Sequence, residues 1–355
     1  MLSTSGPDPA TRVSRPVSAP DHEGSVDLLM SALEDELKTV HLAGVGHRIV
    51  HGGATYSAPR KIDPEMVAAL RGLGAFDPEH LPPEISLIEA FHRRLPDAPQ
   101  VACFDTAFHH DLPRVARLLP IPRRYEAKGV RRYGFHGLSC TFLMAELARL
   151  DGADAANGRV VLAHLGSGAS LTAVQGGRSV DTSMSFTPAS GVPMSSRAGD
   201  LDPGLMAYLA RTENMTPDQF AEMVNFTSGL LGISETSGDM AELIKHEADD
   251  PRAAEAVAIF CYQVRKWIGA FAAALGGLDT LVFAGGIGEN APVVRARICE
   301  DLGFLGVDLD PARNDANAPI ISTEASRVRV RVIHTDEEVV IARSVAEVLG
   351  LGAPA

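Results

Sequence analysis

Two arginines of this chain occupy settings in which a guanidinium group can bind an anion. Arg48 lies in the segment HRIVHGG and Arg197 in SSRAGDLDPG, and both stand beside glycine-rich, loop-like sequence. Arginine binds a carboxylate or a phosphate through two parallel hydrogen bonds, and binding residues are often carried by loops. A solvated surface position also explains each arginine taken alone. The two are therefore candidates for holding an anionic substrate.

Two carboxylates follow apolar runs that predict β-strands. Asp105 comes directly after the run at 100–104, in FDTAFH, and Glu337 follows the run at 328–333, in HTDEE. Carboxylates at strand ends often hold the metal ion of a phosphoryl-transfer site. For Glu337, a favourable interaction with the amino-terminal end of the following helix explains the position as well.

Two glycine-rich segments are candidates for binding phosphate, because the chain contains no P-loop sequence of the form GxxxxGKS or GxxxxGKT. They are HLGSG at 164–168 and GGIGEN at 285–290, where small residues let backbone N–H groups approach anionic oxygens. A hairpin turn explains the first segment, and a tight turn between a strand and a helix explains the second, equally well. The spacing of the second segment does not fit a dinucleotide-binding unit.

Several histidines are close together in the sequence, as they are in many metal hydrolases. His47 and His51 are four residues apart, and His109 and His110 are adjacent. His47 and His51 lie in a segment that predicts a strand, in which residues four apart lie about 13 Å from each other. We therefore expect no transition-metal centre.

Periodicity predicts the elements that position these groups. Apolar residues three and four apart predict a helix over 25–37, and short apolar runs predict strands at 46–50 and 100–104. From residue 159 on, RVVLAH, ASLTAV and RSVDTS predict three short strands that open a second domain. Helices are then predicted near 203–210, 217–224, 238–245 and 252–275. Further on, the strands at 280–284 and 328–333 alternate with helices, which predicts an α/β protein with a largely parallel sheet.

The composition is that of a globular protein of one or two domains. Of the 355 residues 45% are hydrophobic, and the net charge of -13 disfavours binding to nucleic acid. The four cysteines are scattered and there is no secretory signal, so we expect free thiols. No apolar run reaches the roughly 18 residues of a membrane-spanning helix. We therefore expect a cytoplasmic protein that does not associate with membranes.

The first twenty residues are rich in serine and proline and have no apolar periodicity, which predicts a disordered tail. A transit peptide is the alternative, since Arg12 and Arg15 lie among serines, but the segment shows no amphipathic helix.

Taken together, these segments resemble the acetate kinase family. GHRIVHGG, FDTAFHHDLP, RRYGFHGLS, HLGSGASLTAV, SRAGDLDPG, VFAGGIGENAPVVR and TDEEVVIAR stand in that family's order and spacing, from about residue 21 onward. The resemblance implies an α/β, two-domain actin-like ATPase (ribonuclease H-like) fold with duplicated βββαβαβα units. It assigns 21–107 with 339–355 to a first domain and 108–338 to a second, nucleotide-binding domain.

The resemblance also implies reversible phosphoryl transfer from ATP to acetate, giving ADP and acetyl phosphate, with Mg²⁺ or alternatively Mn²⁺. Arg48 and Arg197 resemble the arginines that hold carboxylate and phosphate, and His136 resembles the histidine that hydrogen-bonds the phosphoryl group. Asp105 and Glu337 resemble the carboxylates that position substrate and metal, Glu337 being the metal ligand. The nucleotide-binding positions are His164, Gly166, Ser167, Gly168, Asp239, Gly286, Ile287 and Gly288. The acyl pocket is formed by Val50, Phe135 and Pro188.

Several positions depart from the family pattern. The serine- and proline-rich tail stands where the family has a strand and an NAGSSSxK loop, so we expect an incomplete first domain. Ser167 replaces an asparagine, Glu79 an apolar pocket residue and Ala241 an adenine-stacking arginine. The alternative functions are a propionate or other short-chain carboxylate kinase, and a catalytically impaired nucleotide-binding homologue. The resemblance implies a homodimer.

Overall fold

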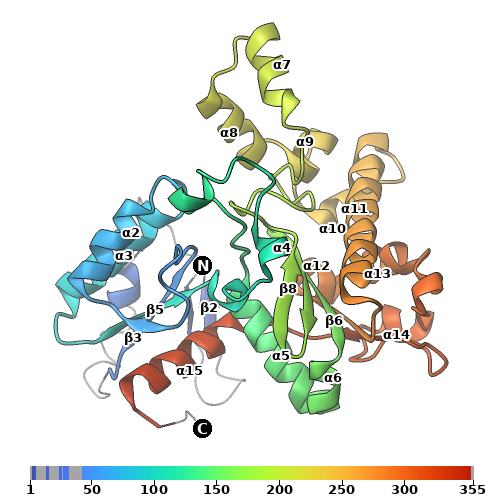
Figure 1. Cartoon of the computed structure of the whole chain (residues 1–355). Coiled ribbons are helices and arrows are strands. Elements are labelled where there is room, and N and C mark those ends of the chain that lie inside the picture. Colours follow the sequence, from blue (N-terminus) through green and yellow to red (C-terminus); the bar gives the residue numbers. More distant parts are fainter. Residues whose placement is uncertain (1, 5–12, 16–23, 26, 32–41, 353–355) are drawn as a thin grey trace. The chain divides into compact units, whose positions relative to one another are not determined.

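The computed structural model describes residues 2–4, 13–15, 24–25, 27–31 and 42–352. The contacts divide the chain into two compact units (Figure 1). Unit 1 comprises Met1–Phe104 and Ile341–Ala355, and unit 2 comprises Asp105–Val340.

A three-stranded sheet forms the centre of unit 1. Strand β3 (Val45–Ile49) pairs in parallel with β5 (Gln100–Phe104), and β4 (Arg60–Lys61) pairs antiparallel with the other edge of β5. Every residue of β5 is buried, as expected for a central strand that is covered on both faces. Helices α2 (Pro64–Gly72) and α3 (Leu81–Arg94) lie between β4 and β5 in the sequence.

Local sequence accounts for where these elements begin. Asp63 caps α2, since its carboxylate accepts the Met66 N–H at 2.7 Å, and Pro64 occupies the first helical turn. The strand predicted at 100–104 is confirmed, and the strand predicted at 46–50 is confirmed with a start one residue earlier.

The amino-terminal part of unit 1 is described only in short pieces. Leu2–Thr4 (β1) and Val13–Arg15 (β2) pair as antiparallel strands, which differs from the disordered tail we expected. We expected disorder because the tail lacks apolar periodicity. Backbone hydrogen bonds between two segments do not require such periodicity. Residues 24–25 and 27–31 are helical, in agreement with the helix predicted from residue 25. The other residues of both predictions lie outside the described residues.

Strand β3 and helix α15 (Glu337–Leu349) approach each other closely in unit 1 at Gly46. A Cβ atom on Gly46 would lie 2.2 Å from Ile341 Cγ2 and 2.9 Å from Val345 Cγ2. We expect Gly46→Val to lower the free energy of unfolding by about 1–3 kcal/mol, the usual effect of overpacking. Urea denaturation measures this change. Gly72→Ala, at a position where a Cβ meets nothing within 4 Å, is the control; equal midpoints for both variants would contradict the close approach.

Unit 2 is built on a five-stranded sheet in the order β10-β9-β6-β7-β8. Strands β6 (Arg159–Leu165), β7 (Ala169–Gln175) and β8 (Arg178–Thr182) form an antiparallel meander. Strands β9 (Thr280–Ala284) and β10 (Arg329–Val332) extend the sheet in parallel from the other edge of β6. These strands confirm the predicted meander and the two later strands.

The sheet of unit 2 is mixed, whereas the sequence predicted a largely parallel one. The difference lies in the meander, where short turns return the chain beside the strand it has just left. Gly176 and Gly177, between β7 and β8, have φ angles of 59° and 72°, a left-handed conformation that suits a two-residue hairpin turn. Only the βα connections that lead to β9 and β10 produce parallel pairs.

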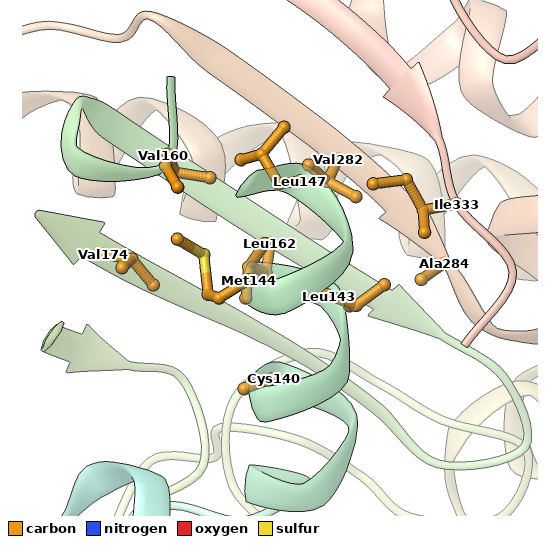
Figure 2. Close-up of a cluster of buried hydrophobic side chains, with 11 residues drawn as sticks. Cys140, Leu143, Met144, Leu147, Val160, Leu162, Val174, Val282, Ala284 and Ile333 are labelled. Carbon is orange, nitrogen blue, oxygen red and sulfur yellow. The ribbon is translucent and has the colours of Figure 1, made fainter. Parts of the chain in front are cut away.

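Helix α5 (Gly137–Asp151) covers one face of this sheet. Leu143 and Leu147 of α5 are fully buried in a cluster with Leu162 of β6 and Val282 of β9 (Figure 2). Helix α11 (Pro251–Leu275) packs against β6 and β7 on the side away from α5 (Figure 1). Because both faces are covered, the ends of the strands are the places where this unit can form a site.

The remaining helical elements of unit 2 connect and flank the sheet. They are η2 (Ala107–His109), α4 (Arg114–Arg117), η3 (Glu126–Lys128), α6 (Ala153–Asn157), α7 (Gly204–Thr212), α8 (Pro217–Phe226), α9 (Gly229–Ser234), α10 (Met240–His246), α12 (Gly285–Asn290), α13 (Pro292–Cys299), η4 (Gly303–Leu305) and α14 (Pro311–Asp315). Helices α7, α8, α10 and α11 confirm the predictions within a few residues, whereas α9 and α12 were not predicted. In the described part of the chain, no helix has the length and apolar character needed to cross a membrane.

Candidate active site in unit 2

A cavity of about 600 Å³ lies in unit 2 where β6 and β9 end. Its wall includes the segments after these two strands, together with the first residues of α10 and α13. A largely apolar wall with a few polar groups is typical of a small-molecule site. The predicted nucleotide-binding residues in this wall are Gly166, Ser167, Asp239, Gly286 and Ile287. The other lining residues are Ser195, Gly238, Met240, Ala241, Ile244, Asn290, Ala291, Pro292 and Val293.

Helix α12 forms one side of the cavity, and its glycines explain its position. Gly285 has a φ angle of 75°, and a Cβ there would lie 2.7 Å from the Leu165 carbonyl oxygen, so only glycine starts the helix this close to β6. Gly288 does not line the cavity, although we expected it to. A Cβ on Gly288 would lie 3.6 Å from the Ala163 carbonyl oxygen, so this residue faces the sheet.

The hairpin turn between β6 and β7 lies between this cavity and a cluster of basic side chains. Gly166 and Ser167 face the cavity, and the Gly166 N–H closes the turn by donating to the Gly168 carbonyl at 3.0 Å. A Cβ on Gly168 would lie 3.2 Å from His136 Nε2 and 3.7 Å from Arg197 Nη1. The HLGSG segment is therefore a hairpin turn and also the element that joins the cavity to His136 and Arg197.

His136 and His164 form the centre of the basic cluster. Their rings are 4.4 Å apart between centroids, with His136 at the start of α5 and His164 near the end of β6. His136 has a φ angle of 58°, a left-handed conformation that costs energy for a residue other than glycine. Ser170 Oγ lies 2.9 Å from His136 Nδ1, and Ser139 Oγ lies 2.8 Å from His164 Nδ1.

Arg197 approaches the same turn from a loop before α7. Its Nη1 donates to the Pro188 carbonyl at 3.3 Å and lies 3.7 Å from the Met194 sulfur. Phe135 and Pro188, two of the predicted acyl-pocket residues, are both buried. The loop is held tightly, because a Cβ on Gly229 would lie 2.2 Å from the Met194 carbonyl oxygen.

Asp105 and Glu337 both lie near the buried thiol of Cys140 in unit 2. The pKa of the Cys140 thiol is raised to about 12, mainly by burial and in smaller part by the charges of Asp105 and Glu337. Carboxylates suit a magnesium ion that takes its other ligands from phosphate and water. Among the described residues, no three histidine, cysteine or carboxylate side chains are arranged to form a complete metal cage. The donors present therefore fit a cation that arrives with a phosphorylated substrate.

Two predicted site residues, Arg48 and Val50, belong to unit 1. Arg48 is exposed on β3, and the buried Val50 follows the strand, with its N–H donating to both carboxylate oxygens of Glu84 at 3.0 and 3.2 Å. The side chains of His47 and His51 are buried, and each makes a hydrogen bond within unit 1. His47 Nε2 lies 2.6 Å from Gln100 Oε1, and His51 Nδ1 accepts the Gly53 N–H at 2.8 Å.

His109 is buried in contact with Phe135 and Ser179. Its burial makes the free energy of unfolding depend on pH. Its Nδ1 lies 2.9 Å from Ser179 Oγ and its Nε2 lies 2.9 Å from the Phe135 carbonyl oxygen. Burial lowers the pKa of His109 from 6.5 to about 4. Between these two values the unfolded chain binds a proton that the folded chain does not, so stability falls as the pH falls through this window.

We expect the parent protein to lose about 3 kcal/mol of unfolding free energy across that window through His109 alone, and His109→Gln to abolish this part of the slope. Urea denaturation at a series of pH values measures both slopes. Burial also lowers the pKa of His47, so a slope of the same sign remains in the variant. Identical slopes in the two proteins would contradict the assignment.

Three hydroxyl residues of the site, Ser139, Ser170 and Thr335, were not found from the sequence. Ser139 Oγ contacts Thr335 Oγ1 at 2.7 Å, although the two residues are 196 positions apart. Serine and threonine carry no distinguishing pattern at such separations, and the local signal was that Ser139, Ser170 and Thr335 lie in the motifs RRYGFHGLS, HLGSGASLTAV and TDEEVVIAR. Their contribution depends on tertiary contacts.

Comparison with known proteins identifies this arrangement. Residues 8–343 match the family model described as the acetokinase family, so the match begins earlier than residue 21, where we expected it to begin. The chain is 46% identical to the acetate kinase of Rhodopseudomonas palustris over 91% of this chain and 81% of that protein. It is 44% identical to the propionate kinase of Citrobacter rodentium over 92% of this chain and 83% of that protein.

Solved structures of such enzymes share the fold. The acetate kinase of Porphyromonas gingivalis matches with a TM-score of 0.87 and 36% identity, over 95% of this chain and 87% of that one. A propionate kinase from Francisella tularensis matches with a TM-score of 0.88 and 33% identity, over the same shares of the two chains. The predicted actin-like α/β fold is confirmed. The chain belongs to the acetokinase family, whose members are phosphotransferases with a carboxyl group as acceptor.

Proposed function

We propose that this protein is an acetate kinase, which transfers a phosphoryl group between ATP and acetate to give ADP and acetyl phosphate in organic acid metabolism. The observation that carries the proposal is the position of the β6–β7 turn. One side of the turn lines the cavity, and its other side contacts His136 and Arg197. A nucleotide seated in the cavity would therefore direct its phosphates along the turn toward these two side chains.

The side chains beside the turn suit direct phosphoryl transfer. Such transfer passes through a loose transition state in which the enzyme positions the reactants and compensates negative charge. His136 supplies a hydrogen-bond donor beside Gly168, and Arg197 supplies a positive charge at the same place. We propose that Arg48 supplies a second positive charge, which binds the carboxylate of the acyl substrate. The phosphates of ATP would be bound by His164, Gly166, Ser167 and Gly168.

The carboxylates of Asp105 and Glu337 would hold a divalent cation, Mg²⁺ or alternatively Mn²⁺. The cation neutralises phosphate oxygens when it is bound. Asp105 is fully buried directly after β5, and Glu337 is the first residue of α15, so both carboxylates are carried by ordered elements.

Propionate is the second candidate substrate, because relatives named as propionate kinases match almost as well. We propose that Val50, Phe135 and Pro188 surround the acyl group and that their volume decides between acetate and propionate. Mixing the purified protein with ATP, Mg²⁺, hydroxylamine and acetate, propionate or butyrate tests this through the acyl hydroxamate that forms. A higher kcat/KM for propionate would favour the second candidate, and no hydroxamate from any acid would indicate an impaired homologue.

The cavity is expected to bind the adenosine part of ATP. A Cβ on Gly286 meets nothing within 4 Å, so Gly286→Leu places a side chain into the cavity without disturbing its neighbours. We expect the KM for ATP to rise about tenfold or more, because each lost apolar contact reduces binding energy, with little change in the melting temperature. Gly269→Leu on α11, also without neighbours within 4 Å, is the control. An unchanged KM for ATP in Gly286→Leu would place the nucleotide elsewhere.

We further propose that units 1 and 2 are the two kinase domains, that the protein is cytoplasmic and that it acts without nucleic acid or membrane. A homodimer is proposed from the resemblance to the acetate kinase family. Light scattering after gel filtration measures the mass in solution.

A further inference from the structure

Three hydroxyl groups behind the two histidines have no role in the transfer described so far, although Ser170 contacts His136, and Ser139 and Thr335 form a chain that ends at His164. Each imidazole is held at Nδ1 by a serine, His136 by Ser170 at 2.9 Å and His164 by Ser139 at 2.8 Å. Both serines are buried, with exposed fractions of 1% and 0%. Ser139 Oγ is held in turn by Thr335 Oγ1 at 2.7 Å.

The number of hydroxyl hydrogens decides the direction of the Ser170 hydrogen bond. A serine has one hydrogen to donate, and buried polar groups are nearly always hydrogen-bonded. Within the described residues, the Ser170 hydroxyl has His136 Nδ1 as its partner and no other. Ser170 therefore donates to Nδ1, and the single proton of a neutral His136 imidazole lies on Nε2.

The same count applies to the second histidine through Ser139, which is fully buried, whereas Thr335 is partly buried. Thr335 Oγ1 has Ser139 as its one partner in the part of the chain that the structure describes. If Ser139 donated to Thr335, the Thr335 hydrogen would have no acceptor among those residues. When Thr335 donates to Ser139 and Ser139 donates to His164, both hydrogens are used. His164 Nδ1 is then an acceptor, and its proton also lies on Nε2.

Thr335 is itself held at the helix that lines the cavity. Its N–H donates to Glu289 Oε1 at 3.1 Å, and the same oxygen accepts the Gly285 N–H at 2.9 Å at the start of α12. The other Glu289 oxygen lies 2.6 Å from His334 Nδ1. The hydroxyl chain therefore has a fixed end, and it connects α12 with His164.

We propose that Ser139, Thr335 and Ser170 are positioning residues that keep the proton of both imidazoles on Nε2. The proposal rests on the function proposed above, because His136 Nε2 is the nitrogen that approaches Gly168, where Arg197 Nη1 also lies close. An N–H at this position donates to phosphoryl oxygens as they gain negative charge. Two neutral rings also avoid the repulsion of two imidazolium ions whose centroids are 4.4 Å apart.

The position of each proton is measured by long-range ¹H–¹⁵N NMR of the full chain labelled with ¹⁵N-histidine, at a pH above the usual histidine pKa. His136→Asn and His164→Asn assign the signals. In the parent we expect both rings to be protonated on Nε2. In Ser139→Ala the His164 signals should move toward a mixture of tautomers while those of His136 stay, and Ser170→Ala should have the opposite effect. Protonation of His164 or His136 on Nδ1 in the parent would overturn the proposal, whether or not the variants fold.

Kinetics provide the second readout. We expect Ser139→Ala to lower kcat about tenfold, because it removes the hydroxyl that holds the His164 imidazole at Nδ1. Thr335→Val should have a similar effect, and Thr335→Ser should restore activity. Thr141→Val is the matched control, because this hydroxyl of α5 donates to the Gly137 carbonyl at 2.8 Å, outside the chain. Equal kcat values for Ser139→Ala and Thr141→Val would count against the proposal.

The two readouts separate this proposal from the function on which it rests. Correct tautomers in a protein that forms no acyl phosphate would refute the proposed function and leave the positioning role in place. An active kinase whose His164 or His136 carries its proton on Nδ1 would refute the positioning role and leave the proposed function in place.

Discussion

Arg197→Ala is expected to lower kcat about 10²- to 10³-fold while changing the KM for ATP by less than about threefold. Arg197 Nη1 and His136 Nε2 both approach Gly168, and Arg197 is not part of the cavity wall. Loss of its charge therefore leaves the transferring phosphoryl group uncompensated but leaves the proposed adenosine site intact. Steady-state rates of hydroxamate formation at varied ATP concentration measure both constants.

Two further variants show whether charge or geometry is responsible. Arg197→Lys keeps the charge but lacks the planar fork of donors, so its kcat should fall between those of the parent and Arg197→Ala. Arg178→Ala, at an exposed position of β8, is the control and should have the parent rate. If Arg197→Ala kept more than about half of the parent activity, the catalytic role of Arg197 would be wrong. Arg48→Ala should have an effect of the same order and tests the contribution of unit 1.

His136→Ala is expected to lower kcat by a similar factor, about 10²- to 10³-fold, because it removes a donor placed at developing charge. His136 is only 8% exposed, and its Nε2 lies beside the turn that joins the cavity to Arg197. The ring acts by hydrogen bonding in this proposal, and direct transfer requires no phosphohistidine. Rates and incubation with labelled ATP are measured on the same preparation.

We expect no stable label on His136 in the parent protein. His246→Ala, an exposed histidine of α10 that lies 3.6 Å from Glu242, is the control for the rate and should be neutral. Recovery of a stoichiometric phosphohistidine that passes its phosphate to acetate would rule out direct transfer. A full rate in His136→Ala would instead remove this histidine from the mechanism.

Local sequence was sufficient for much of the fold. The strands at 100–104 and 280–284 are continuous apolar runs, and their boundaries were predicted without error because a buried strand leaves few alternatives. The segment GGIGEN was predicted as a turn but forms helix α12. Glycine has a low helix propensity, and Gly285 is required by its close approach to Leu165, a tertiary contact that no local pattern contains.

The sequence by itself determined the family, since the order and spacing of its motifs are far more specific than any one of them. It also supplied the residues with distinctive chemistry, among them Arg197, His136 and Asp105. Tertiary structure decided which of these act together and which hydroxyl groups support them. Ser170 reaches His136 because β7 pairs with β6, and Ser139 meets Thr335 across 196 residues. A hydroxyl gains its role from its neighbours in space, and sequence spacing carries no record of contacts that the packing of a helix on a sheet creates.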